Sequence, residues 1–238
     1  MILKVQNLSV AYPGGTPLFR DVNLELPRGQ RLIVFGSNGC GKSTFLKSLL
    51  DSRLRHAGSV QWAVKPHEIL QVTQGRGFHD QSPDYVEDYL LKSRSLLTPF
   101  QFRHAELRQE IASLLKRLQL PNLPLQILSG GQRQKLKIAR AFLNKASVFL
   151  LDEPLNAVDS ASKKEILEIL EELSPQTLQI WVLHDFFEMQ KVQAPVLWIQ
   201  NPRAEVWSFQ SWLKRIDQDF HLWMKTPLQQ KEGPWNRV

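Results

Sequence analysis

The amino-acid sequence predicts an α/β fold with a mixed, mainly parallel sheet, an antiparallel β layer at its N-terminus and a helical subdomain. Three short and almost entirely apolar segments carry the main prediction, at residues 32–35, 147–151 and 179–183. Strands of a parallel sheet have this composition because helices cover both of their faces. A chain of 238 residues, 42% of them hydrophobic, can bury the core of one such domain.

Residues 2–12 and 18–26 are predicted to form the antiparallel layer. In the second segment, Val22, Leu24 and Leu26 alternate with polar residues, which is the pattern of a strand with one buried face. A Pro-Gly-Gly run between the two segments supplies the turn that joins them. We therefore expect the chain to enter the fold through two antiparallel strands.

The region from about residue 83 to 145 is predicted to form the helical subdomain. Five apolar residues in it recur at the spacing of one helix face: Leu107, Ile111, Leu114, Leu115 and Leu118. Pro121 ends this pattern, because a proline cannot continue a helix.

A glycine-rich run follows the first apolar segment and precedes a helix-forming one. It consists of Gly36, Ser37, Asn38, Gly39, Cys40, Gly41, Lys42, Ser43 and Thr44. The pattern G-x-x-x-x-G-K-[ST] turns a strand into a helix, so that backbone N–H groups and the positive helix end converge on one anion. It predicts the phosphate-binding loop of a P-loop NTPase. Lys42 is expected to bridge the β- and γ-phosphates of a nucleotide, and the Ser43 hydroxyl to coordinate Mg²⁺.

A second motif, Leu128-Ser129-Gly130-Gly131-Gln132, precedes a basic helix. The backbone amides of its last four residues are predicted to form another anion cradle at a helix N-terminus. A single nucleotide does not need two cradles from one chain. We therefore expect this motif to close over the γ-phosphate that another protomer holds.

In combination, these motifs resemble those of the ATP-binding cassette (ABC) ATPases, with residues 128–132 as the family signature. The resemblance covers about residues 1–210 and implies one ABC ATPase domain. The segment 148–154 is similar to the Walker B motif of that family. This similarity implies that Asp152 orders Mg²⁺ through water and that Glu153 polarises the attacking water.

Four more positions match the family pattern one by one. Tyr12 lies where these ATPases stack an aromatic ring on adenine, although an ordinary strand residue would look the same. Gln74 resembles the glutamine that contacts Mg²⁺ and the water, with Gln71 as the competing choice. Asp159 matches the aspartate of the D-loop, and it can also cap the helix that follows. His184 matches the histidine that contacts the γ-phosphate.

Two residues depart from the pattern of that family. The D-loop segment begins with Asn156 where Ser is more usual, and we expect this change to alter contact across a dimer. Cys40 stands where Ala or Ser is often found in the phosphate loop. Because a helix N-terminus favours a thiolate, Cys40 is expected to be reactive, and its alkylation is expected to block ATP binding.

The resemblance implies ATP as the substrate, Mg²⁺ as the cofactor, and a second ABC subunit in a head-to-tail dimer, with a homodimer expected. It also implies a separate transmembrane permease. No apolar run approaches the ~20 residues that cross a bilayer, so a membrane role requires another chain. The one cysteine cannot form an internal disulfide, which suits a reducing interior. We therefore expect a cytoplasmic protein, held at the inner face of the cell membrane by its permease.

A net charge of +7 leaves open a rival class, a soluble ABC-type ATPase that acts on nucleic acid or ribosomes. Such ATPases usually carry a coiled-coil insertion, zinc cysteines or a second cassette, and this sequence has none of these, so no nucleic-acid partner is expected. The compact spacing from Gly58 to Gln74 is similar to that of zinc and manganese importers. This similarity implies a metal ion as the transported substrate.

A tail at residues 211–238 lies beyond the family match and is rich in tryptophan. Its aromatic and basic side chains allow two interpretations. The tail packs on the edge of the cassette, which we expect, or it docks on a partner or on a lipid headgroup region.

Overall fold

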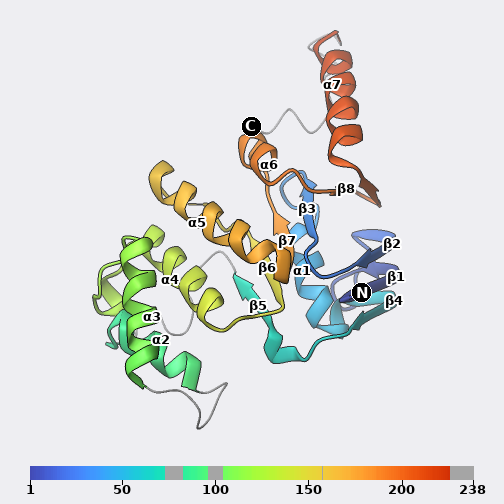
Figure 1. The fold of residues 1–238 in the computed structure, drawn as a ribbon. Helices are drawn as coiled ribbons and strands as arrows, with labels where there is room; N and C mark the ends of the chain where they lie inside the picture. The colour runs from blue at the N-terminus through green and yellow to red at the C-terminus, as the bar shows by residue number, and fades with distance from the viewer. Residues whose placement is uncertain (73–82, 96–103, 157, 226–238) are drawn as a thin grey trace. The chain divides into compact units, whose positions relative to one another are not determined.

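The computed structural model describes residues 1–72, 83–95, 104–156 and 158–225 (Figure 1). The chain folds into two compact units. The first unit contains residues 1–27, 31–63 and 180–238, and the second contains residues 28–30 and 64–179. Strand β7 (Leu178–Val182) runs across the boundary between them.

The strands of the first unit follow the order β4-β1-β2-β9-β8-β3. Their bounds are β1 (Leu3–Val10), β2 (Phe19–Leu26), β3 (Arg31–Gly36), β4 (Arg55–Trp62), β8 (Val196–Gln200) and β9 (Arg203–Trp207). Its helices are α1 (Lys42–Leu50), α6 (Phe186–Val192) and α7 (Phe209–Lys225). Strands β3 and β8 are parallel, with Ile33 beside Val196, whereas β8 and β9 form an antiparallel hairpin. The predicted mixed α/β sheet is confirmed.

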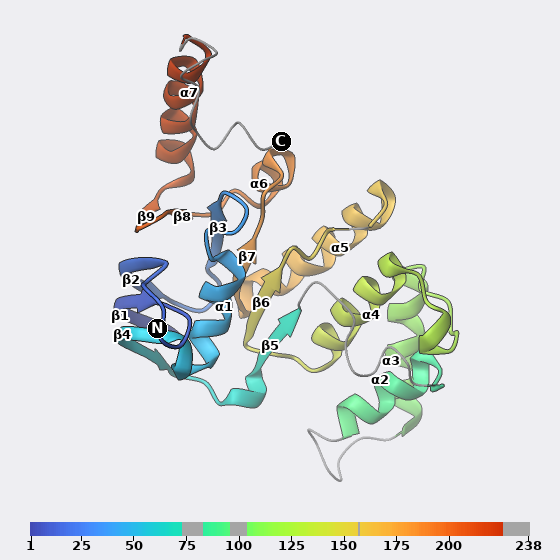
Figure 2. The same cartoon turned by 180° about the vertical axis from the view of Figure 1, so that it is seen from behind.

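The antiparallel layer consists of β1, β2 and β4, and Figure 2 shows these strands together beside α1. Leu3 of β1 pairs with Leu26 of β2 on one side and with Trp62 of β4 on the other. Along β2, Phe19, Val22, Leu24 and Leu26 are buried while most residues between them are exposed. A strand alternates in this way when only one of its faces packs on the core.

The core of the first unit lies around β3 and α1. Leu32, Ile33 and Val34 of β3 are completely buried, as are Phe45 and Leu46 of α1. Burial of all three successive side chains means that both faces of β3 are covered, which is the environment that its apolar sequence predicts. The loop between β3 and α1 therefore leaves a strand buried on both faces and enters a helix packed into the same core.

The second unit pairs a small parallel sheet with helices. Strand β5 (Ile69–Val72) runs parallel to β6 (Val148–Asp152), with Ile69 beside Val148. The helices are α2 (Val86–Ser95), α3 (His104–Arg117), α4 (Gly130–Leu143) and α5 (Ser160–Leu173). Helices α2, α3 and α4 pack against one another (Figure 1). The five apolar residues that predict a helix face between residues 107 and 118 are all buried.

Helix α7 packs on the first unit through an aromatic cluster. Trp212 is completely buried, and Phe209 and Ile216 are buried on the same face of the helix. The ring of Trp212 lies 5.0 Å from that of Phe35 on β3, edge to face, and 5.9 Å from that of Phe209. These are favourable aromatic geometries. Of the tail's other tryptophans, Trp235 lies outside the described residues.

Within the described ranges, no helix combines the length and the apolar character that a membrane span needs.

Candidate nucleotide site

The predicted site residues fall into two groups, one in each unit. The first group surrounds the phosphate loop between β3 and α1. Lys42 begins α1 and is buried, with only 6% of its surface exposed. Its Nζ donates hydrogen bonds to the backbone oxygens of Gly36, at 2.8 Å, and Ser37, at 3.0 Å. The ammonium group is thus held inside the loop, where it adds positive charge to the N-terminus of α1.

Two glycines of the loop are sterically required. A Cβ at Gly36 would lie 2.5 Å from the Ile199 oxygen and 2.6 Å from Cys40 Sγ, so no larger residue fits there. Gly41 is the N-cap of α1 and has φ 105°, in the region that L side chains rarely adopt. The loop therefore leaves its backbone N–H groups uncovered by side chains at these positions, as an anion cradle requires.

Tyr12 lies close to the phosphate loop in the same unit. Its hydroxyl is hydrogen-bonded to Thr44 Oγ1 at 3.0 Å, while 58% of the residue is exposed. The side chain is therefore tethered at its hydroxyl and presents much of its surface to solvent. Thr44, to which the hydroxyl is bonded, is buried. The exposed ring of Tyr12 is compatible with the predicted stacking on adenine.

The expectation that Cys40 carries a favoured thiolate is wrong. Cys40 is buried, with 4% of its surface exposed. Burial raises the pKa of its thiol, and the attraction of the nearby Lys42 ammonium, which lowers the pKa, offsets only part of that effect. Removal from water penalises the thiolate more strongly than the helix N-terminus and Lys42 favour it.

Asn201, which no sequence motif singles out, supports the phosphate loop from the turn between β8 and β9. With its amide oriented to satisfy its neighbours, Asn201 Nδ2 donates to the oxygens of Leu18 and Cys40, both at 3.0 Å. The contact joins segments that are far apart in the sequence, so no local pattern could have revealed it.

His184 also belongs to the first unit. It follows β7 and is exposed, and the next residue, Asp185, caps α6. Asp185 Oδ1 accepts hydrogen bonds from the backbone N–H groups of Phe187, at 2.7 Å, and Glu188, at 3.3 Å. His184 is thus placed at a strand end, immediately before a firmly capped helix.

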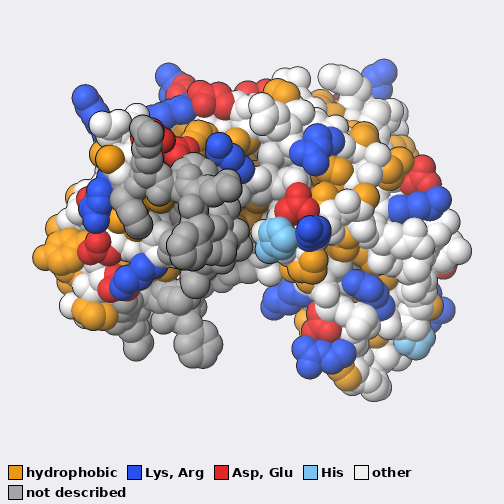
Figure 3. All heavy atoms as spheres, turned by 60° about the horizontal axis from the view of Figure 1, so that its bottom comes forward, with side chains coloured by type: hydrophobic (Ala, Val, Ile, Leu, Met, Phe, Trp, Pro, Cys, Tyr) orange, Lys and Arg blue, Asp and Glu red, His pale blue; other side chains and the backbone are white. Residues whose placement is uncertain are grey.

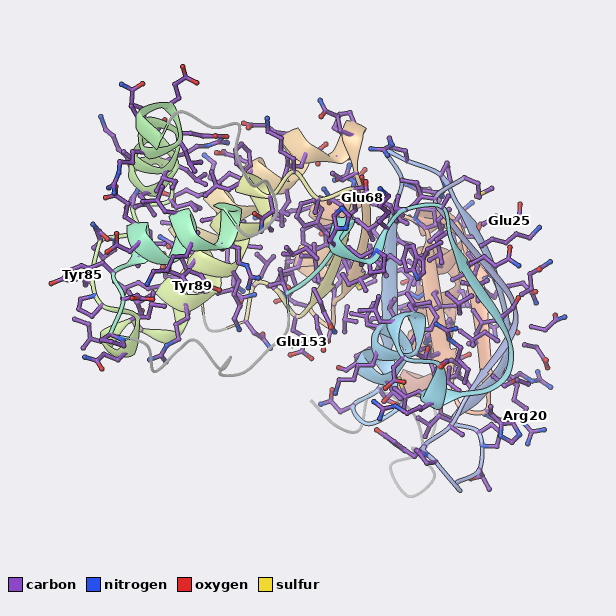
Figure 4. The ribbon with its side chains drawn as sticks, turned by 90° about the horizontal axis from the view of Figure 1, so that it is seen from below. Arg20, Glu25, Glu68, Tyr85, Tyr89 and Glu153 are labelled. Atoms are coloured by element: carbon purple, nitrogen blue, oxygen red, sulfur yellow. The ribbon has the colours of Figure 1, made fainter. Side chains whose placement is uncertain are left out.

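The second group of predicted residues begins at the end of β6, where Figure 4 labels Glu153. Asp152 is the last residue of the strand and is buried. Glu153 is half-buried and has φ 50°, which is uncommon for a residue other than glycine. Asn156 Nδ2 donates a hydrogen bond to Glu153 Oε2, and the Asn156 backbone N–H donates to the Glu153 backbone oxygen at 3.2 Å. The expectation that Asn156 alters contact across a dimer remains a prediction.

The signature motif forms the N-terminus of α4. Ser129 is its N-cap: Ser129 Oγ accepts from the Gln132 N–H at 3.2 Å, and Gln132 Oε1 accepts from the Ser129 N–H at 2.9 Å. This reciprocal capping box fixes the first turn of the helix. Ser129 and Gly130 are exposed, so the helix N-terminus is accessible to an anion.

Asp159 is the N-cap of α5. Its carboxylate accepts from the Ser162 N–H at 2.9 Å and from the Ser162 hydroxyl at 2.6 Å. These hydrogen bonds lower the pKa of Asp159, because they favour its charged form. The capping role is thus present in the structure, and a D-loop role remains a prediction.

An ion pair between a buried lysine and a half-buried glutamate joins α4 to α5. Lys135 Nζ lies 3.6 Å from Glu165 Oε2, and Gln119 Nε2 donates to Glu165 Oε1 at 2.6 Å. Lys135 is buried. The helix that begins with the signature is therefore tied to the helix that Asp159 caps, a link that sequence reasoning missed.

The residues predicted to hold Mg²⁺ are Ser43, Gln74 and Asp152, and Gln74 lies outside the described residues. The hydroxyl of Ser43 and the carboxylate of Asp152 are hard oxygen donors, the type that Mg²⁺ prefers. Within the described ranges, no group of three or more His, Cys, Asp or Glu residues could hold a metal ion on its own. Ser43 belongs to the first unit and Asp152 to the second, and each by itself suits Mg²⁺ that is bound mainly by phosphate oxygens and water, because such sites use only one or two protein ligands. That the two residues share one ion remains a prediction.

A family model described as "ABC transporter" matches residues 19–156. The arginine transport ATP-binding protein ArtP of Haemophilus influenzae is 31% identical over 84% of this chain and 89% of its own length. The manganese transport system ATP-binding protein MntB of Halalkalibacterium halodurans is 31% identical over 84% and 83%, respectively. Other relatives are longer, and this chain spans 58% of the sn-glycerol-3-phosphate import protein UgpC of Cupriavidus metallidurans.

Solved structures have the same fold. A structure described as a metal-chelate type ABC transporter in an inward-facing conformation aligns with a TM-score of 0.73 and 28% identity, over 92% of this chain and 89% of that one. The ATP-binding cassette MJ0796, bound to ADP and Pi after hydrolysis, aligns with a TM-score of 0.72 and 22% identity, over 87% and 99% of the two chains.

Proposed function

The chain belongs to the ABC transporter family and is an ATP hydrolase, and on that premise we propose that it is the energy-coupling subunit of a membrane transporter. One observation carries the proposed mechanism: each unit contains a helix N-terminus suited to a phosphate. In the first unit, Gly41 and Lys42 begin α1, and in the second, the exposed Ser129 and Gly130 begin α4. We propose that one triphosphate is bound by both kinds of helix N-terminus and that the two come from different chains.

In this proposal, two protomers associate head to tail, with each ATP between the phosphate loop of one and residues 129–132 of the other. Tyr12 stacks on adenine, and Lys42 neutralises the β- and γ-phosphates. Ser129 Oγ accepts its hydrogen bond from the Gln132 N–H. The hydroxyl hydrogen of Ser129 therefore remains available to donate to a phosphate oxygen. Such a dimer has two equivalent sites related by a two-fold axis.

Glu153 is proposed to polarise the attacking water, and His184 to contact the γ-phosphate. A carboxylate positioned as a general base contributes roughly 10²–10⁴ in rate. Its place immediately after β6 suits this role, because ligands of α/β sheets bind at the carboxyl ends of the strands.

Mg²⁺ would be held by Ser43, Gln74 and Asp152, and when bound it supplies charge neutralisation to the β- and γ-phosphate oxygens. The position of Asp152 at the end of β6 supports this assignment, since ligands of α/β sheets bind at the carboxyl ends of the strands.

ATP is proposed to act as the link that holds the dimer closed. Loss of the γ-phosphate removes contacts that the closed form makes and the open form does not. A conformational change requires such a difference in interaction free energy between the two states. The cycle of closing and opening would then drive a separate transmembrane permease.

We propose a metal ion as the transported substrate. The manganese transport relative and the metal-chelate type transporter structure support it. The arginine transport relative has the same identity as the manganese one, so arginine is the comparison substrate in any assay. The proposed location is the cytoplasmic face of the cell membrane, where the chain is held by the permease.

An affinity-tagged chain, purified from detergent-solubilised membranes of its native cells, tests the transporter role. We expect it to bring down a polytopic membrane protein in stoichiometric amount. We also expect reconstituted vesicles to move Mn²⁺ across their membrane in preference to arginine when Mg-ATP is supplied on the side that carries the ATPase. Membranes from cells that express the untagged chain are the control.

Strong stimulation of ATP hydrolysis by RNA or DNA, without a membrane partner, would instead favour the nucleic-acid class. On the face shown in Figure 3, the Lys and Arg side chains of the described residues lie scattered among acidic and apolar ones. Among the described residues of that face they form no continuous basic stripe of the kind that tracks a phosphate backbone.

A further inference from the structure

The side chain of Asn156 contacts the carboxylate of Glu153 within one turn of chain. Asn156 Nδ2 donates to Glu153 Oε2, and the backbone N–H of Asn156 closes the turn by donating to the Glu153 oxygen at 3.2 Å. Both side chains are half-buried, so water competes only partly for this hydrogen bond. A hydrogen bond to a charged acceptor is stronger than one between neutral groups.

The backbone of Glu153 adopts an unusual conformation that the contact with Asn156 helps to hold. Its φ of 50° lies in the left-handed region, which costs free energy for a residue with a side chain. Such a conformation persists only where its surroundings hold it. The turn that Asn156 closes from both its backbone and its side chain is one such restraint, and it directs the carboxylate as well as the backbone.

The chemical nature of the donor matters. An amide Nδ2 can donate but cannot accept, so it cannot take a proton from water itself. It can hold one oxygen of the Glu153 carboxylate in place.

We propose that Asn156 is a positioning residue for Glu153: its amide orients the carboxylate that polarises the attacking water. This inference rests on the proposed role of Glu153 in hydrolysis. Asn156 therefore acts on the chemical step through Glu153 rather than through ATP binding. A better oriented base lowers the barrier of hydrolysis without changing the affinity for nucleotide.

The test compares steady-state ATP hydrolysis of the wild-type chain with that of Asn156→Ala and Asn156→Asp. Loss of one hydrogen bond to a charged group predicts a fall in kcat of about tenfold for Asn156→Ala, with the KM for ATP and the nucleotide Kd unchanged. Asn156→Asp has nearly the same shape but places a negative charge against Glu153. We expect it to be slower than Asn156→Ala.

Asn122→Ala is the matched control. Asn122 also donates from Nδ2 to a carboxylate, that of Glu87, at 3.4 Å, and its Oδ1 accepts from the Glu87 N–H at 3.0 Å. Removing this pair affects the start of α2 rather than the end of β6. We expect Asn122→Ala to retain the wild-type kcat even if its unfolding temperature falls.

The double variant Asn156→Ala with Glu153→Gln separates a positioning role from a general structural one. If Asn156 acts through Glu153, the added substitution leaves the residual turnover of Glu153→Gln unchanged, because the group it orients is already gone. A further fall of about tenfold in the double variant, or a wild-type kcat in Asn156→Ala, would overturn the inference. Failure of the proposed function is distinguishable, because Glu153→Gln would then hydrolyse ATP at the wild-type rate.

Discussion

At the scale of single residues, Cys40 shows how burial can reverse an expectation based on position alone. Its place near the N-terminus of α1 and beside Lys42 suggests a favoured thiolate. The folded chain removes the sulfur from water, and this raises the pKa of Cys40 despite the Lys42 charge. Desolvation depends on which residues surround the sulfur, and only the tertiary structure contains that information.

Alkylation of Cys40 by iodoacetamide tests this conclusion. Because the raised pKa lowers the thiolate fraction at every pH below it, we expect slow modification at pH 7 and a rate that increases with pH above the ordinary thiol pKa of about 8.5. Saturating Mg-ATP should slow the reaction further. The measurement is the mass increase over time, and Cys40 is the one cysteine in the chain.

The same reaction in urea is the control, because the unfolded chain exposes the sulfur and restores ordinary thiol reactivity. Modification of the folded chain at pH 7 faster than that of the unfolded chain would contradict the burial argument and reinstate a reactive thiolate.

At the scale of secondary-structure elements, α7 is part of the first unit rather than an appendage. Trp212 is completely buried against Phe35 of β3 and Phe209 of its own helix. A deletion that begins at residue 211 would therefore remove core packing together with any docking surface. A deletion that begins at residue 226 keeps α7 whole and isolates the effect of the last residues.

Trp212→Ala is expected to lower the free energy of unfolding by about 3–5 kcal/mol, because it removes a large buried ring and leaves a cavity. Urea denaturation followed by circular dichroism measures this change. Lys214→Ala, an exposed change on the same helix, should alter it by less than about 0.5 kcal/mol. Equal stability of Trp212→Ala and the wild type would show that α7 does not pack on the unit in solution.

At the scale of the whole molecule, the proposed function places the two half-sites of each ATP in different chains. Lys42 sits in the phosphate loop of the first unit, and Gly131 lies in the first turn of α4 in the second. If each ATP needs one half-site from each protomer, defects in the two halves can complement each other. If each ATP uses both half-sites of one chain, the two defects cannot complement each other.

Mixing equal amounts of Lys42→Ala and Gly131→Asp chains distinguishes the two arrangements. Each variant alone should be inactive. Lys42→Ala lacks the ammonium group that neutralises the phosphates, and Gly131→Asp places a carboxylate against the phosphate. Random pairing in a head-to-tail dimer leaves about a quarter of the sites intact, so ATP hydrolysis should return to about a quarter of the wild-type rate. The sum of the separate rates, with no gain on mixing, would contradict a shared site.

The sequence by itself determined the fold class and the chemistry of the phosphate loop. Apolar strands, a left-handed glycine at position 41 and the Ser129 capping box are set by neighbouring residues, because backbone conformation and helix capping are local properties. The order of these motifs was enough to indicate the family.

The tertiary structure decided what depends on residues brought together by folding. It set the ionisation of Cys40, the support of the phosphate loop by Asn201 and the burial of Trp212. It also placed the Asn156 amide on the Glu153 carboxylate. These two residues are close in the sequence, but their contact occurs with Glu153 in an unusual backbone conformation, at φ 50°. Desolvation, packing and side-chain direction arise from three-dimensional surroundings, and a linear pattern of residue types does not specify them.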